Sequence, residues 1–220
     1  ADPAWFSSDP QRAWGFYGHR RNLYRQTEPH SGFAILKSWL ERKPEPGFVF
    51  TSNVDGHFQA SGFSDDRIVE CHGTIVFNQC AVPCCKEIWM AQEEAVQVYM
   101  QSFRAREPLP RCRFCGSCSR PNILMFGDAT WLEARTAGQF RGYQTWLKSI
   151  QGHRLAIIEI GAGTAVPTVR RQCEWLARTT GGHLIRINPR EAHGQDVISI
   201  AASGLKALQS IDLILSTNRS

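Results

Sequence analysis

The sequence predicts an α/β protein with a parallel, doubly wound sheet and a small metal-binding insertion. In the second half of the chain, short apolar runs alternate with patterns of helical spacing, which is typical of a sheet built from βαβ units. The apolar run 48–51 shows no polar alternation, as expected for a parallel strand covered on both faces. Residues 71–120 differ from their neighbours because they are rich in cysteine and proline.

Two helices are expected before the first strand. The first covers residues 9–25, where large side chains recur at helical spacing: Trp14, Tyr17, Arg21 and Tyr24. Pro29 opens the second helix, which runs to about residue 41 and ends before Pro44. The strand 48–51 then leads directly into a polar loop, residues 52–56.

Strands and helices should alternate after the insertion. Within the insertion we expect a short strand at 74–77 and a helix at 91–103. Beyond it we expect, in this order, strand 122–126, helix 130–149, strand 155–160, helix 166–179, strand 183–187 and helix 195–209. Because parallel α/β sheets bind ligands at the carboxyl ends of their strands, the candidate binding loops are 52–56, 161–167 and 188–191.

The composition argues against several classes of protein. The chain has 220 residues, of which 42% are hydrophobic, so it can bury a sizeable core. No apolar run approaches the roughly 20 residues of a membrane helix, so we expect no membrane partner. The formal charge of +5 is mild and scattered, whereas nucleic-acid readers concentrate their basic residues. With no export signal at its start, the chain is predicted to be cytoplasmic, and no oligomeric state is predicted.

Two close cysteine pairs predict one structural zinc site. The eight cysteines include Cys80 with Cys84 and Cys112 with Cys115, and four thiolates satisfy zinc tetrahedrally. Disulfides are the alternative, but they suit secreted proteins. Cys85 could replace Cys84, and Cys118 is a weaker alternative in the second pair. The remaining two cysteines, Cys71 and Cys173, are expected to be buried thiols.

Polar residues near the predicted strand ends are candidates for chemistry. His72 follows a short apolar stretch, and an imidazole can act as a base near neutral pH. A lone histidine is more often structural, and the other histidines, His57 among them, are interpreted so. Asn53 and Asp55 could orient a water and bind a carboxamide or a hydroxyl, or could form an Asx turn before Gly56.

A loop of small residues is the candidate nucleotide contact. Gly161, Ala162, Gly163 and Thr164 follow a predicted strand and open a helix, where backbone N–H groups can hold a phosphate or a ribose. A plain strand-to-helix turn is equally compatible with this pattern. Asn188 could bind a ribose hydroxyl, or could simply form a turn before Pro189.

Six motifs, in the same order along the chain, resemble those of sirtuins, the NAD-dependent protein deacylases. Residues 51–56 resemble the family's Thr-Gln-Asn-Ile-Asp-Gly, residues 70–74 its His-Gly-Ser, and the two cysteine pairs its zinc module. Residues 120–128 resemble Arg-Pro-x-x-Val-x-Phe-Gly-Glu. Residues 161–167 resemble Gly-Thr-Ser-x-x-Val-x-Pro with one residue fewer, and residues 187–188 match Ile-Asn.

The resemblance implies a fold, an activity and two bound groups. A Rossmann-like NAD-binding domain would comprise residues 1–70 and 121–220, and the zinc-binding module residues 71–120. The activity would be that of an NAD-dependent protein lysine deacetylase or deacylase, a transferase or hydrolase that releases nicotinamide and O-acyl-ADP-ribose. NAD and one structural zinc would be bound, and an acyl-lysine protein or peptide would be the substrate.

The resemblance also implies a role for each candidate residue. His72 would be the general base, Asn53 would position ribose or water, and Asp55 would contact the nicotinamide amide. The cofactor-binding set would be Ser52, Asn53, Asp55, Gly161, Gly163, Thr164 and Asn188. The substrate peptide would pair, as an added strand, with the backbone of Leu124, Met125, Phe126, Gly127 and Asp128.

Three departures from the family pattern leave other functions open. Ser52 replaces a glutamine, and His57 with Phe58 replaces Leu-His, which alters packing under the loop. The family's first strand and its Gly-Ala-Gly-Ile-Ser phosphate loop have no counterpart in the 220 residues. Either the sequence is that of a longer protein without its front end, which is the favoured explanation, or the chain is a degenerate relative, and as it stands it is expected to be a poor catalyst. A non-catalytic zinc-stabilised binding protein and an NAD-dependent ADP-ribosyltransferase are the alternatives.

Overall fold

The computed structural model describes residues 2–217 and divides the chain into two compact units. Unit 1 takes in the chain up to Glu28 and Thr51–Arg141, and unit 2 takes in Pro29–Phe50 and the chain from Gly142 on. These units do not follow the predicted boundaries near residues 70 and 120, so the domain assignment made from the sequence stays a prediction. The strand β1 (Val49–Thr51) and the helix α5 (Ala134–Ser149) each pass from one unit to the other.

Unit 2 contains the predicted parallel sheet. Its strands are β8 (Ala156–Ile160), β9 (His183–Ile187) and β10 (Val197–Ile200), in the order β10-β9-β8, and all pairs are parallel. The helices of this unit, apart from the end of α5, are α3 (Ser31–Glu41), α6 (Thr168–Thr180) and α7 (Gly204–Thr217). The sequence therefore predicted the class of this sheet correctly.

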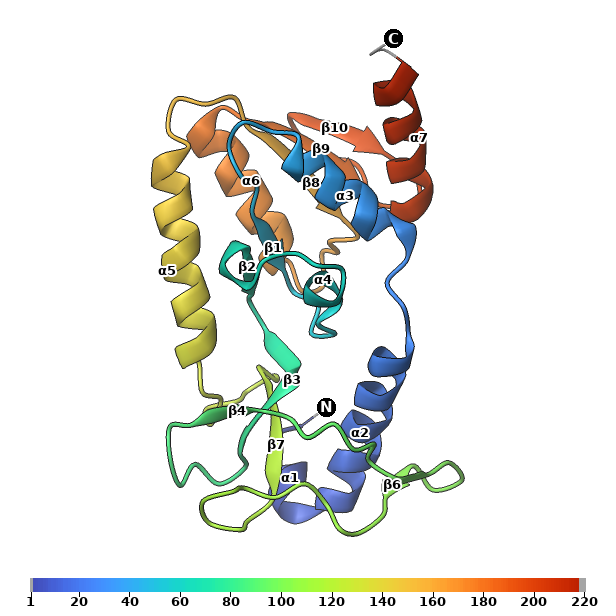
Figure 1. The fold of residues 1–220 in the computed structure, drawn as a ribbon, viewed down its shortest axis with the longest axis vertical. Helices are drawn as coiled ribbons and strands as arrows, with labels where there is room; N and C mark the ends of the chain where they lie inside the picture. The colour runs from blue at the N-terminus through green and yellow to red at the C-terminus, as the bar shows by residue number, and fades with distance from the viewer. Residues whose placement is uncertain (1, 218–220) are drawn as a thin grey trace. The chain divides into compact units, whose positions relative to one another are not determined.

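Both faces of the sheet are covered, as in a doubly wound fold. Because side chains alternate along a strand, Ile185 and Ile187 of β9 share one face, where α3 and α7 pack against it and against each other (Figure 1). Leu184 lies on the opposite face with Ile157 and with Leu176 of α6. The near-continuous apolar strands follow from this double burial.

The predicted helix at 195–209 is wrong in its first half. Residues Val197–Ile200 form β10, with Ile198 opposite Ile185 of β9, and α7 begins only at Gly204. Three of the four strand residues are β-branched, which favours an extended backbone. Ile200 also packs into the core beneath α7. Pairing with β9 thus decided the conformation of a stretch that helical spacing alone misassigned.

Unit 1 is built on an antiparallel sheet and one long helix. The sheet has the order β4-β3-β7, and a separate pair joins β5 to β6. The elements are α1 (Trp5–Ser8), α2 (Pro10–Gln26), α4 (His57–Ala60), the 3-10 turn Asp65–Arg67, β2 (Ile68–Glu70), β3 (Gly73–Cys80), β4 (Ile88–Met90), β5 (Val98–Tyr99), β6 (Arg104–Ala105) and β7 (Ser119–Ile123). The strand predicted at 122–126 therefore lies earlier, because β3 pairs with residues 119–123.

Helix α2 organises the core of unit 1. It begins where the Asp9 carboxylate accepts the backbone N–H of Arg12 at 3.3 Å, directly before Pro10, an N-terminal arrangement that favours helix initiation. Trp14, fully buried, packs in the same apolar cluster as Ile75 of β3 and Ile123 of β7. The two strands that carry the candidate site are therefore attached to a rigid support.

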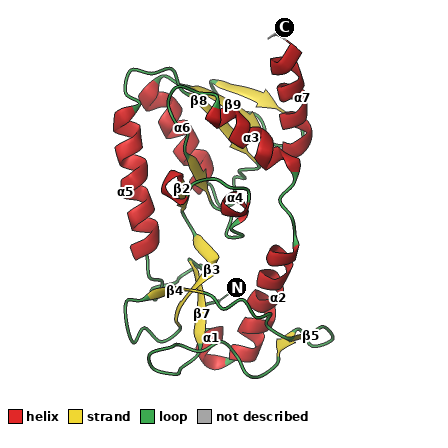
Figure 2. Ribbon diagram, in the orientation of Figure 1, coloured by secondary structure: helices red, strands yellow, loops and turns green. Residues whose placement is uncertain are grey.

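The helix predicted at 91–103 is not formed. Figure 2 shows the segment as loop and short strand. The Asn22 amide binds both the N–H (3.2 Å) and the carbonyl (2.7 Å) of Val96, and Arg25 donates to the carbonyls of Gln92 and Glu93 at 2.6 and 2.9 Å. These side chains of α2 hold the backbone extended and occupy the groups that a helix would use internally.

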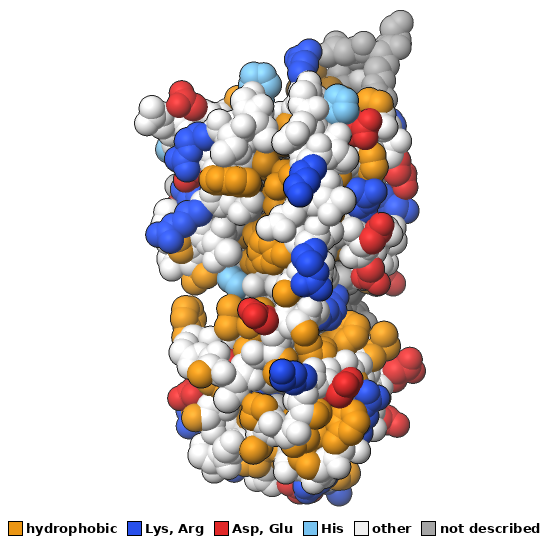
Figure 3. Space-filling model, turned by 90° about the vertical axis from the view of Figure 1, so that its left-hand side faces the viewer, with side chains coloured by type: hydrophobic (Ala, Val, Ile, Leu, Met, Phe, Trp, Pro, Cys, Tyr) orange, Lys and Arg blue, Asp and Glu red, His pale blue; other side chains and the backbone are white. Residues whose placement is uncertain are grey.

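The surface is mixed in charge. On the face that Figure 3 displays, basic and acidic side chains are interspersed and apolar side chains lie between them. Among residues 2–217, no helix combines the length and the apolar character that crossing a membrane requires.

Candidate functional site

The candidate base His72 lies in the tight turn between β2 and β3. Gly73 has φ +73°, and a Cβ there would lie 2.1 Å from the backbone oxygen of Asn122, so only glycine fits. The backbone oxygen of His72 accepts the N–H of Leu124 at 2.9 Å. The turn is therefore fixed against β7, and glycine at position 73 is a steric requirement of the fold.

The polar loop after β1 runs along both sides of this turn. The N–H of Cys71 donates to the Thr51 oxygen at 2.9 Å, and the N–H of Ile75 donates to the Val54 oxygen at 2.8 Å. The loop that carries Ser52, Asn53 and Asp55 is thus bonded before and after His72. Asn53 is exposed, whereas Ser52 and Asp55 are half-buried. The structure brings these predicted residues to one place in unit 1.

Burial changes the pKa of the His72 imidazole. His72 is half-buried, and the loss of solvent lowers its pKa below the usual value. A lowered pKa favours the neutral ring near pH 7. A neutral imidazole can accept a proton, which is what a general base must do.

A buried polar network anchors the strand that leads to His72. Glu70 is 2% exposed, and its carboxylate accepts Arg135 Nη2 at 2.5 Å and the Gln139 amide at 3.3 Å. Gln139 also accepts the backbone N–H of Glu70 at 3.1 Å, and the Thr136 hydroxyl donates to the Glu70 backbone oxygen at 3.2 Å. The first two turns of α5 therefore hold both the side chain and the backbone of this residue.

The predicted substrate-binding segment forms an arch after β7, closed by a buried ion pair. Arg120 is 1% exposed and Asp128 is 0% exposed at the side chain, with Arg120 Nη2 2.5 Å from Asp128 Oδ2. Burial acts to raise the pKa of Asp128, but the Arg120 hydrogen bonds outweigh it and hold that pKa below its usual value. Met125 points inward at 7% exposure, whereas Phe126 is 82% exposed.

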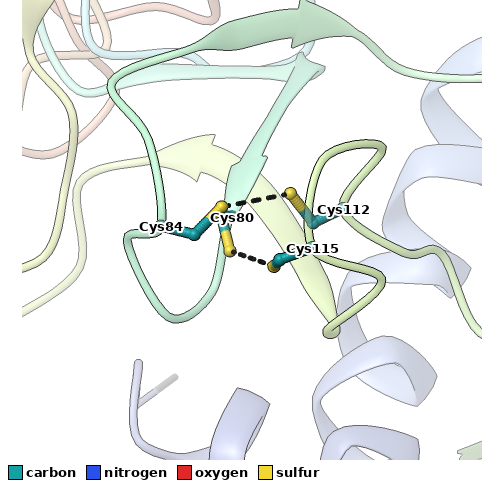
Figure 4. Close-up of side chains that lie close together, drawn as sticks. All are labelled: Cys80, Cys84, Cys112 and Cys115. Atoms are coloured by element: carbon teal, nitrogen blue, oxygen red, sulfur yellow. Dashed lines mark hydrogen bonds between the residues drawn. The ribbon is translucent and has the colours of Figure 1, made fainter.

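The four predicted zinc ligands converge in unit 1. The Sγ atoms of Cys80 and Cys115 are 3.7 Å apart, and those of Cys84 and Cys112 are 3.6 Å apart (Figure 4). All four lie within 4.8 Å of one another. Tetrahedral bonds of about 2.3 Å to zinc would place thiolates about 3.8 Å apart. The cluster therefore fits one zinc ion, with Cys84 rather than Cys85 in the set.

The second cysteine pair sits in a turn suited to metal binding. The N–H of Gly116 donates to the Cys112 oxygen at 2.9 Å, and Gly116 adopts φ +72°. Hydrogen bonds from the Ser117 hydroxyl and backbone lower the pKa of the Cys115 thiol to about 6. Stabilising the thiolate in this way favours metal ligation, because zinc binds the deprotonated form. Among the described cysteines, none forms a disulfide.

Unit 2 brings together the other predicted residues, at the ends of β8 and β9. The Asn188 amide donates to the Ala162 oxygen at 3.2 Å, which joins the two candidate loops. Glu191 accepts the backbone N–H of Thr164 at 3.0 Å and its hydroxyl at 2.8 Å. Arg170 donates to the backbone oxygens of both Ala162 and Glu191, at 3.0 and 2.6 Å.

Gly161 leaves this loop open on one side, whereas a Cβ at Gly163 would lie 3.4 Å from Glu191 Oε2. A Cβ added at Gly161 would meet no atom within 4 Å, and its φ of +69° is the reason that glycine is favoured there. Below the loop, Glu159 and Arg186 form a buried ion pair across adjacent strands, with Oε1 and Nε 2.6 Å apart. The loop therefore follows strands that a buried ion pair holds together.

Several structurally important partners escaped the sequence analysis. Arg120 lay within a quoted motif, but its pairing with Asp128 was not anticipated. Arg135, Arg170 and Glu191 belonged to no motif, and Arg135 lies 65 positions after Glu70. Such pairs depend on tertiary contacts, and spacing in one sequence gives no signal for them.

Comparison with known proteins connects this site to a family. The sequence pattern of the Sir2 family matches residues 1–142. The chain is 30% identical over 194 residues to an NAD-dependent protein deacylase of Deinococcus radiodurans, covering 86% of this chain and 69% of that protein. It is 27% identical over 191 residues to an NAD-dependent protein deacylase of Aquifex aeolicus, covering 87% and 70%.

Solved structures share the fold. A Sir2 homologue in complex with 2'-O-acetyl ADP ribose gives a TM-score of 0.71 at 20% identity, covering 100% of this chain and 79% of that chain. Sir2Tm bound to a propionylated peptide gives a TM-score of 0.62 at 21% identity, covering 96% and 81%. Fold and site therefore define an α/β protein with a four-cysteine zinc site. Within that class, the chain belongs to the Sir2 family.

Proposed function

We propose that the protein is an NAD-dependent protein lysine deacylase that releases nicotinamide and forms O-acyl-ADP-ribose. The observation that carries the proposal is the arrangement around His72 in a Sir2-family chain. Main-chain hydrogen bonds join the turn that carries this half-buried residue to the loop 51–56 through Cys71 and Ile75, and to the arch 124–128 through the His72 backbone oxygen. Family relatives named NAD-dependent protein deacylases support the assignment.

Each candidate residue of unit 1 would have a separate role in the reaction. NAD, when bound, supplies a ribose carbon joined to nicotinamide, a leaving group. His72 would accept a proton from a ribose hydroxyl, for which its neutral ring is suited. Asp55 would accept from the nicotinamide amide, and Asn53 would orient the ribose or a water. The polar donors and acceptors of this loop fit such a molecule, because Asn53 is exposed and Asp55 half-buried.

The residues of unit 2 and the arch would bind rather than react. Gly161, Gly163, Thr164 and Asn188 would contact the ribose and phosphate parts of NAD, since a Cβ at Gly161 would meet no atom within 4 Å and Glu191 fixes Thr164 within the loop. The backbone of residues 124–128 would pair with the acyl-lysine peptide. The zinc would be structural, because four cysteines leave no position for a substrate.

The test is nicotinamide release from NAD in the presence of an acetyl-lysine peptide. Changing His72→Ala should reduce the rate about 10²- to 10⁴-fold, the usual contribution of a general base, with unchanged circular dichroism. His153→Ala is the matched control, because His153 is exposed in a turn of unit 2. Binding of NAD without any release by the unaltered chain would favour a non-catalytic binding protein instead.

ADP-ribosyl transfer is the second candidate. A relative from Fusarium oxysporum, named a probable bifunctional ADP-ribose hydrolase/ADP-ribosyltransferase, is 26% identical over 174 residues, covering 73% of this chain and 28% of that protein. Labelled NAD separates the two functions. Label on a small acyl-ribose product supports deacylation, whereas label retained on protein supports transfer.

Location and partners follow from the same assignment. We place the protein in the cytoplasm, because a zinc site of four cysteine thiols needs a reducing compartment. The interspersed charges of the face in Figure 3 support a peptide partner over nucleic acid. The oligomeric state stays open, and size-exclusion chromatography with light scattering measures it.

A further inference from the structure

Residue 57 contacts both oxygens of the Asp55 carboxylate. The backbone N–H of His57 donates to Asp55 Oδ1 at 2.9 Å. The ring nitrogen Nδ1 of His57 lies 3.9 Å from Oδ2, and the two side chains are only 14% and 21% exposed. Water therefore competes weakly for this pair, and the charge on the ring matters to the carboxylate.

The other ring nitrogen identifies the tautomer. His57 Nε2 lies 3.1 Å from the backbone oxygen of Tyr24 in α2. A carbonyl can only accept, so Nε2 must carry the hydrogen. In the neutral ring, Nδ1 then presents a lone pair to the carboxylate. Only the protonated ring presents an N–H to Asp55, so the ring attracts the carboxylate in one charge state and not in the other.

This arrangement departs from the family motif. The sirtuin motif has leucine at the position of His57, and leucine has no group that titrates. Titratable side chains that face the ring include Asp55 from its own loop and Tyr24 from α2, whose ring meets the imidazole edge-on at 6.2 Å. Imidazole is also the side chain that ordinarily changes charge between about pH 5 and 8.

We propose that His57 is a positioning residue for Asp55, and that protonation of its ring draws the Asp55 carboxylate away from its ligand. The inference rests on the proposed function, in which Asp55 accepts a hydrogen bond from the nicotinamide amide. With His57 protonated, Asp55 Oδ2 is engaged by the ring. With His57 neutral, that oxygen is available. Nicotinamide binds more weakly in acid as a result.

The experiment measures the inhibition constant of nicotinamide against pH for the full chain and two variants. In the unaltered chain, nicotinamide should bind about threefold more weakly at pH 5.5 than at pH 7.5, because the ring and the carboxylate are 3.9 Å apart and their attraction is modest at that distance. His57→Leu and His57→Gln should both abolish this dependence. Glutamine can still donate to the Tyr24 oxygen but cannot become charged, so it separates the charge of residue 57 from its packing.

A second readout needs no activity. Nitrogen-15 spectra of the imidazole should show the Nε2–H tautomer at pH 8, and Asp55→Asn should alter the His57 signals at pH 6. A chain that releases no nicotinamide at all would refute the proposed function, and the spectra would still decide the role of His57. The Nδ1–H tautomer at pH 8, unaltered signals in Asp55→Asn, or a pH dependence that survives in His57→Leu would each overturn the inference.

Discussion

Units 1 and 2 hold their candidate residues by different means. In unit 1, backbone hydrogen bonds and a glycine that tolerates no Cβ fix His72 between two segments. In unit 2, the candidate loop is held largely by side chains, with Glu191 binding both donors of Thr164. The Glu191 side chain is 39% exposed. The proposed base is therefore held by main-chain contacts in a turn between two strands, whereas the proposed ligand contacts of unit 2 depend on groups that water can replace.

The difference predicts how each part tolerates substitution. A buried ion pair left without one partner is costly, because the remaining charge stays desolvated. An exposed hydrogen bond lost to water costs little. Removing one partner of a buried ion pair in unit 1 should therefore reduce the stability of the fold, whereas removing an exposed contact in the unit 2 loop should change ligand binding only slightly.

The largest effect is expected from breaking the zinc site. Cys112→Ser should abolish binding of one zinc and lower the melting temperature of unit 1 by roughly 10 °C or more, since a structural metal contributes directly to folding. Zinc content by mass spectrometry and thermal melts measure both. Cys85→Ser is the control, because its thiol is outside the cluster. Full zinc retention in Cys112→Ser would show that another ligand closes the site.

The buried pair of the arch should give the next largest effect. Asp128→Asn leaves Arg120 charged and 1% exposed, so the free energy of unfolding should fall by about 3 kcal/mol. Urea denaturation measures it. Glu41→Gln is the control, because the Lys37–Glu41 pair is exposed, and it should change stability by less than about 0.5 kcal/mol. Equal losses in the two variants would remove the distinction between buried and exposed pairs.

The sequence could predict the features that show in local patterns, but not those that depend on distant contacts. The parallel sheet of unit 2 and the four zinc ligands were visible in apolar runs and in cysteine spacing. The helices at 91–103 and at the start of 195–209 were wrong, because Asn22 and Arg25 hold the first segment extended and β9 pairs with the second. Local patterns give no sign of partners so distant in sequence.

The candidate site was also predictable only in part. His72 could be proposed from its motif, and Gly73 supplies the physical reason for that motif. The partners that hold the site were not visible, because Glu70 meets Arg135 only in the folded chain. His57 was interpreted as structural, yet it contacts Asp55. These partnerships depend on contacts between side chains, which the positions of the residues in the sequence do not indicate.

The reaction should depend on pH through the protonation of His72 in unit 1. Burial lowers the pKa of His72, so the neutral base persists below the ordinary imidazole value of about 6.5. The fall of kcat/KM in acid solution should therefore have its midpoint below pH 6.5. For stability the sign is the same: the contribution of the buried ring is full above pH 6.5 and declines as pH falls through the lowered pKa.

The measurement uses the peptide kcat/KM at saturating NAD. It is made in His57→Leu as well as in the unaltered chain, so that the ring beside Asp55 does not contribute. The fall in acid should persist in both proteins. A midpoint above pH 6.5 would show that His72 is not the group whose protonation stops the reaction.

The smallest effect is expected in the loop of unit 2. The Thr164 hydroxyl lowers the pKa of Glu191 by hydrogen bonding to its carboxylate, so this contact is complete above the ordinary carboxyl pKa and is lost as pH falls through the lowered value. At pH 7, Glu191→Ala should weaken NAD binding by no more than about fivefold, because water replaces an exposed acceptor. Calorimetry measures the affinity.

Thr164→Ala should cause a similar loss, and the double variant should be no weaker than either one, since both remove the same contact. Losses that add would mean that Glu191 and Thr164 meet the ligand independently, and that this loop is not organised by their hydrogen bonds.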